Sequence, residues 1–149
     1  MHRLGSLSLA TLLVLGACGT ATTAPELVVD PALTFDAAHA RWVAFRPANY
    51  SFEFNEQGSW FFTPGYSRAT VADGRLVALR PVGWHERVSP GAGFTIDELW
   101  ERLAAARMRG EMLADLQFSR EGIPVLAVVG DHAVDGGMTY RLRAFAPTD

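Results

Sequence analysis

The sequence predicts an α+β fold, in which a small antiparallel sheet of about six strands packs two helices on one face. Two observations support this prediction. The strand-like segments are short and are joined by tight turns, which favours antiparallel pairing. Two other segments carry apolar residues at helical spacing. Because the chain has 149 residues, 49% of them hydrophobic, we assign these elements to one domain over residues 34–149.

The first helix is predicted from Ala37 to Phe45, with Asp36 as its N-terminal cap. Within it, Ala38, Trp42 and Phe45 are spaced by four and three residues, which places them on one side. That side is expected to face the core.

The second helix is predicted from a capping box, the sequence Thr95-Ile96-Asp97-Glu98. In this motif the Thr95 side chain and the Glu98 side chain each bind a free backbone N–H of the first turn. Gly110 is a plausible end of the helix. The apolar residues with helical spacing between these limits are Ile96, Leu99, Trp100, Leu103 and Ala106.

Three strands are predicted between the helices. Tyr50-Ser51-Phe52-Glu53-Phe54 alternates strictly, so the three aromatic rings should face the core while Ser51 and Glu53 face water. Two strand-like runs then flank Asp73-Gly74, a pair that tolerates the positive φ angles of a type I′ hairpin turn.

Three more strands are predicted after the second helix, at Leu116-Gln117-Phe118, at Val125–Val129 and at Met138–Phe145. In the last of these, alternation places Tyr140, Leu142 and Ala144 on one face. Arg141 and Arg143 should lie on the opposite, solvated face.

The first residues resemble the signal of a bacterial lipoprotein. A short positive start precedes the mostly apolar run Leu4–Ala17, which is too short to span a bilayer because that needs about twenty residues. The run ends in Leu15-Gly16-Ala17-Cys18, which resembles the lipobox, and Cys18 is the only cysteine. We therefore predict a signal peptide over residues 1–17 and lipidation, with diacylglycerol and palmitate, at Cys18. An ordinary signal peptide cleaved elsewhere is the alternative.

Residues 18–33 are predicted to form a flexible tether, because Gly19–Pro25 is small, polar and turn-prone. The acyl chains would hold the protein to the cell envelope. Gly19 stands where an aspartate would retain a lipoprotein in the inner membrane of Gram-negative bacteria. The expected location is then the outer membrane facing the periplasm, or, in a Gram-positive host, the outer face of the plasma membrane.

From Trp42 onwards the chain resembles a family of small bacterial lipoproteins that carries a domain of unknown function. The matching motifs are the aromatic strand Tyr50-Ser51-Phe52, the hairpin Val71-Ala72-Asp73-Gly74-Arg75-Leu76, the helix start Thr95-Ile96-Asp97-Glu98-Leu99-Trp100, and Gly122-Ile123-Pro124. Members often carry a C-x-C pair where this chain has Trp60-Phe61-Phe62. This chain therefore cannot have a disulfide, metal site or redox function that depends on those two cysteines.

Several candidate sites have simpler explanations. Ser67 lies in Gly65-Tyr66-Ser67-Arg68-Ala69, near a nucleophile elbow, but a hairpin follows where that motif needs a helix. The loop Ser89–Thr95 has the glycines of a phosphate loop, but carboxylates already occupy the first turns of the helix behind it. His39 is most simply a surface residue.

Asp131, His132 and Asp135 form the one loop that could bring metal ligands or acid–base groups together, beside the pair His85-Glu86. A turn rich in aspartate and glycine is the commoner explanation for such a loop. Trp60, Phe61, Phe62, Tyr66 and Trp84 could cover the sheet or form a patch for a partner.

The formal net charge is −3, and all thirteen basic residues are arginines such as Arg68, Arg80 and Arg120, scattered along the sequence. The negative net charge and the scatter of the arginines give no support to a nucleic-acid-binding protein, because such proteins attract phosphates with clustered positive charge. No coherent catalytic set is present, and no cofactor or metal site is predicted. We therefore expect a membrane-anchored binding or scaffolding domain with a protein or small-molecule partner in the envelope. A metal-assisted hydrolase using Asp131, His132 and Asp135, and an inhibitor of a secreted enzyme, are the alternatives.

Overall fold

The computed structural model describes residues 26–58, 65–83, 93–130 and 137–148. It contains an open six-stranded sheet in the order β3-β2-β1-β6-β5-β4, and all neighbouring strands are antiparallel. The predicted α+β class is confirmed. The elements are α1 (Phe35–Phe45), β1 (Tyr50–Gly58), β2 (Ser67–Ala72), β3 (Arg75–Pro81), α2 (Ile96–Met108), β4 (Leu113–Phe118), β5 (Pro124–Val129) and β6 (Met138–Pro147).

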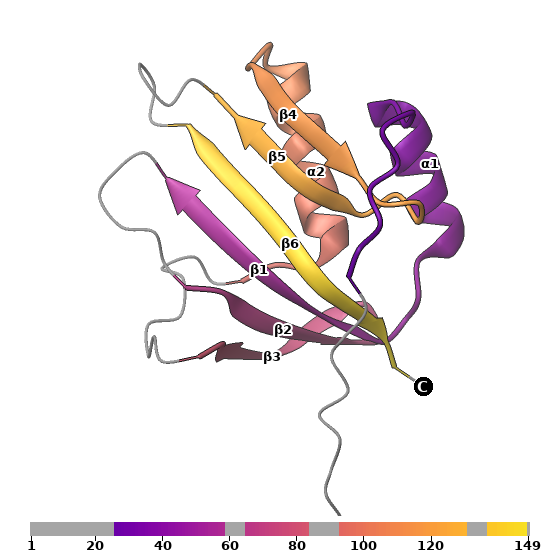
Figure 1. Cartoon of the computed structure of the whole chain (residues 1–149), viewed down its shortest axis with the longest axis vertical. Coiled ribbons are helices and arrows are strands. Elements are labelled where there is room, and N and C mark those ends of the chain that lie inside the picture. Colours follow the sequence, from indigo (N-terminus) through magenta and orange to yellow (C-terminus); the bar gives the residue numbers. More distant parts are fainter. Residues whose placement is uncertain (1–25, 59–64, 84–92, 131–136, 149) are drawn as a thin grey trace, which may run out of the picture.

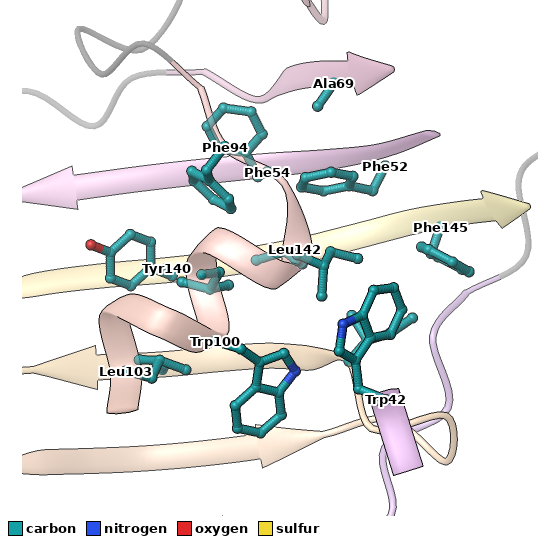
Figure 2. Packing of buried hydrophobic residues seen from close by; sticks show 14 of the residues in the cluster. Trp42, Phe52, Phe54, Ala69, Phe94, Trp100, Leu103, Tyr140, Leu142 and Phe145 are labelled. Carbon is teal, nitrogen blue, oxygen red and sulfur yellow. The ribbon is translucent and has the colours of Figure 1, made fainter. Parts of the chain in front are cut away.

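Both helices pack on the same face of the sheet. In Figure 1, α2 lies behind β5 and β4, and α1 lies beside the end of β4. The core between the helices and the sheet is rich in aromatic rings (Figure 2). Trp42 of α1 and Trp100 of α2 are both buried there. The Trp42 indole Nε1 donates to Asp97 Oδ1 at 3.0 Å, which links the two helices directly.

The cap of α1 differs from the prediction. Thr34 is the N-cap, and its side chain accepts a hydrogen bond from the Ala37 N–H, so the helix begins at Phe35. Asp36 lies in the first turn, where its carboxylate pairs with Arg107 of α2. Thr34 takes the position because a hydroxyl caps a helix nearly as well as a carboxylate.

The folded part of the chain begins before residue 34, so the predicted tether is too long. Val29 forms an isolated β-bridge with Ser119, and the Asp30 N–H donates to the Phe118 carbonyl at 2.8 Å. Leu27 packs against the core. The packing of Leu27 and the backbone bond of Asp30 favour docking of the segment over leaving it in solvent.

The second helix confirms the prediction at both ends. Thr95 and Glu98 form the reciprocal capping box, and the five predicted apolar residues are all buried. At the other end, Gly110 has φ +73. Its N–H binds the Arg107 carbonyl while the Glu111 N–H binds the Ala106 carbonyl, which is the pair of bonds of a Schellman motif.

In β1 the aromatic face is as predicted, since Tyr50, Phe52 and Phe54 are fully buried. The prediction for Glu53 was wrong, because this residue is only 5% exposed. Its carboxylate stays charged in that position because two arginines from neighbouring strands bind it.

The hairpin between β2 and β3 is confirmed, with φ of 49° at Asp73 and 71° at Gly74. In β6 the alternation fails at Ala144, whose φ is 52°. The register with β1 shifts at this point, as in a β-bulge, where one extra residue enters the strand. Phe145 therefore turns to the core in place of Ala144.

Candidate functional site

Most of the predicted site residues lie outside the described part of the chain. These are Cys18, Trp60, Phe61, Phe62, Trp84, His85, Glu86, Asp131, His132 and Asp135. Of the others, Ser67 is fully buried at the start of β2, so the strand context that argues against a nucleophile elbow is confirmed. His39 is exposed, as predicted, with its ring 4.8 Å from that of Trp100.

An open groove of about 880 Å³ lies between the C-terminal half of α2 and the adjoining ends of β5 and β6. The link between α2 and β4 closes one side of it. The lining residues are Arg102, Ala105, Ala106, Arg109, Gly110, Glu111, Met112, Val129, Gly130, Gly137, Met138 and Tyr140. Its volume lies within the range of small-molecule sites, about 300–1,000 Å³.

The charged and phenolic side chains that line the groove belong to Arg102, Arg109, Glu111 and Tyr140. Arg102 Nη1 lies 3.4 Å from Glu56 Oε1, and Arg109 Nε pairs with Glu111 Oε1 at 2.5 Å. Tyr140 stands opposite Glu56 in the register of β6 with β1. Burial raises the pKa of Tyr140, and the negative charge of Glu56 raises it further. The phenol is therefore a neutral hydrogen-bonding group at physiological pH.

The chemistry of this groove suits binding. Met112 is 53% exposed and Met138 is partly buried, so flexible thioether side chains lie beside the paired charges. The Glu111 carboxylate lines the groove and its side chain is 37% exposed, so it can accept a hydrogen bond from a ligand. Such an arrangement can hold a ligand with an apolar part and a hydrogen-bond donor.

The second polar cluster surrounds Glu53 on the opposite face of the sheet. Arg68 Nη2 of β2 donates to Glu53 Oε1 at 2.6 Å, and Arg143 Nε of β6 donates to Oε2 at 2.9 Å. Burial alone would raise the pKa of Glu53, but the two arginines outweigh it and hold the pKa below its usual value. The Arg143 guanidinium also lies 3.7 Å from the centroid of the Tyr66 ring, a cation–π contact.

The sequence did not single out either cluster. In the sequence Arg68 is one of several scattered arginines, and Arg143 is predicted on a solvated strand face. The two lie 15 and 90 positions from Glu53, so no local pattern connects them to it. The groove combines residues of α2, β5 and β6, which no local motif joins. One signal for the cluster around Glu53 was present in the sequence. Arg68, Arg141 and Arg143 occupy outward positions of predicted strands, and such side chains can contact residues on neighbouring strands.

Comparisons with models of protein families, with curated proteins and with solved structures found no match for this chain. The resemblance to the lipoprotein family stays a prediction. Across the described ranges, no helix is long and apolar enough to cross a membrane. Within the same ranges, no three histidine, cysteine, aspartate or glutamate side chains are grouped as ligands for a metal ion.

Proposed function

We propose that this protein is a lipid-anchored binding domain of the bacterial cell envelope. The observation that carries the proposal is the sequence Leu15-Gly16-Ala17-Cys18 behind a short apolar run. A thioether at Cys18 would hold two acyl chains. Each CH₂ group buried in the membrane contributes about 0.8 kcal/mol of binding free energy, so two chains would anchor the protein almost permanently.

The binding part of the proposal is supported by the groove between α2 and the ends of β5 and β6. It is concave and lined by mixed apolar and polar groups, as sites for small molecules are. The partner is a small molecule or a protein segment in the envelope that places an apolar part against Met112 and Met138.

The anchor is tested with Cys18→Ser, because serine keeps the size of the side chain and removes the thiol that carries the lipid. The full chain is expressed in a bacterial host with radioactive palmitate, and the label and the membrane-bound fraction are measured. Wild-type protein should incorporate label and sediment with membranes, while Cys18→Ser should lose the label. Thr22→Ser is the matched control, since it introduces the same residue beyond the lipobox, and it should behave as wild type. Equal labelling of Cys18→Ser and wild type would refute the anchor.

A further inference from the structure

The face of the sheet opposite the helices, here the helix-free face, carries a line of three arginines and one glutamate across four strands. Arg80 of β3 stands opposite Arg68 of β2, Arg68 stands opposite Glu53 of β1, and Glu53 stands opposite Arg143 of β6. Directly paired residues share one face of a sheet. All four side chains therefore lie on the helix-free face, which points toward the viewer in Figure 1.

The adjacent row adds a further positive charge. Arg141 of β6 stands opposite Asn55 of β1 and Leu126 of β5, so it lies on the same face. The two rows hold four guanidinium groups and one carboxylate, that of Glu53, which gives them a net charge of about +3 at neutral pH. The whole chain has a net charge of −3, so these two rows are opposite in sign to the chain as a whole.

The arginines differ in what holds them. Arg68 and Arg143 bind Glu53, yet their side chains remain 55% and 51% exposed. Arg80 is exposed and makes no ion pair within the described chain, while exposed Arg141 reaches Gln57 Oε1 at 3.5 Å. Arg80 and Arg141 are thus open to an anionic partner, and Glu53 fixes the two arginines between them.

We propose that the helix-free face docks on anionic phospholipid headgroups at the membrane surface. Neighbouring strands lie about 4.8 Å apart, so three strand steps from Arg80 to Arg143 span about 14 Å. Charges spread over that width on a sheet match an array of headgroups better than one small anion. Basic side chains near an anionic surface each strengthen binding.

This inference rests on the proposed lipid anchor for the presence of a membrane. Glu26, the first described residue, lies eight residues after Cys18, a span of at most about 29 Å. A domain held at that distance meets the surface at high effective concentration, so weak electrostatic docking is sufficient to orient it. Docking this face would leave the groove on the helix side open to the periplasm or the medium.

The test separates docking from anchoring, because every protein in it carries Cys18→Ser and so has no acyl chain. Binding of the full chain is measured by flotation with vesicles of phosphatidylcholine alone and with vesicles that also contain phosphatidylglycerol. The neutral vesicles report any contribution of the apolar N-terminal run. The test variant is Arg80→Gln/Arg141→Gln, which leaves the Glu53 cluster intact. The control is Arg41→Gln/Arg107→Gln, which removes one exposed arginine from each helix and leaves the groove residues unchanged.

We expect the chain to bind the anionic vesicles more strongly than the neutral ones and to release as salt rises. The test variant should lose about fivefold in partition coefficient for each arginine, or roughly 25-fold in total. The control should keep the binding of the parent chain. Equal losses in both variants would overturn the proposal, because binding would then follow net charge alone. Binding to soluble polyglutamate without binding to the anionic vesicles would also overturn it, since the partner would then be an acidic protein.

Discussion

Gly122 lies in the turn between β4 and β5, where it meets the backbone of α1. Its φ is +83°, and a Cβ built at this position would lie 2.1 Å from the Ala38 carbonyl oxygen and 2.7 Å from the Trp42 nitrogen. Both neighbours are helix backbone, so no side-chain rotation relieves the contact. Substitution by alanine would have to move α1, whose Trp42 is fully buried in the core.

The expected loss for Gly122→Ala combines two terms. Alanine in the left-handed region costs about 1–2 kcal/mol. Overpacking against an element that must shift costs about 1–3 kcal/mol more. We therefore expect the free energy of unfolding to fall by about 2–5 kcal/mol. Urea titration followed by tryptophan fluorescence measures this loss, with the slope showing whether the variant still unfolds in two states.

Gly110→Ala is the matched control, because Gly110 has a similar φ of +73° but no heavy atom within 4 Å of the added Cβ. It should lose only the conformational term of about 1–2 kcal/mol. The difference between the two variants then measures the steric contact with α1. If Gly122→Ala were no less stable than Gly110→Ala, the close approach of the turn to α1 would be refuted.

Two further predictions concern titratable groups of the sheet. The Tyr50 hydroxyl accepts a hydrogen bond from the Ile96 N–H at 3.1 Å, so Tyr50→Phe should cost about 1–3 kcal/mol by leaving a buried donor unpaired. Burial raises the pKa of Tyr50 to about 12 from 10.0, so the unfolded chain ionises first and wild-type stability should fall above pH 10. Tyr50→Phe should show a smaller fall, because Tyr140, whose pKa is also raised, still contributes. For Glu53 the pKa is lowered from 4.5, so its contribution is present above that pH and is lost as the pH falls through the folded-state value. Urea titrations across acidic pH should show Glu53→Gln less stable than wild type at neutral pH and the two converging in acid; a constant difference would contradict the ion-pair account.

Much of the fold could be predicted from local patterns. The capping box at Thr95, the hairpin turn at Asp73-Gly74 and the aromatic alternation of β1 depend on neighbours in the sequence, and the structure confirms them. The cap of α1 was misplaced by two residues because Thr34 and Asp36 are both good capping residues. Ala144 was placed on the wrong face because a bulge breaks strand alternation without a clear signal in composition.

The polar clusters could not be predicted in the same way. Glu53 was predicted to face solvent because, within one strand, the sequence reveals only the alternation of apolar and polar residues and not the neighbouring strands. Its burial depends on Arg68 and Arg143, which strand pairing brings to either side of it. The groove likewise depends on how the end of α2 packs over the ends of β5 and β6.

By itself, the sequence determined the class of the fold, the ends of α2 and the prediction of an anchor at Cys18. These depend on interactions among residues a few positions apart, which periodicity and capping rules describe. Tertiary structure alone decided that Glu53 is buried, that Gly122 must lack a side chain and that four arginines share one face. The physical reason is that each of these features arises from strand register or close packing between distant segments, and register is set only when the whole sheet assembles.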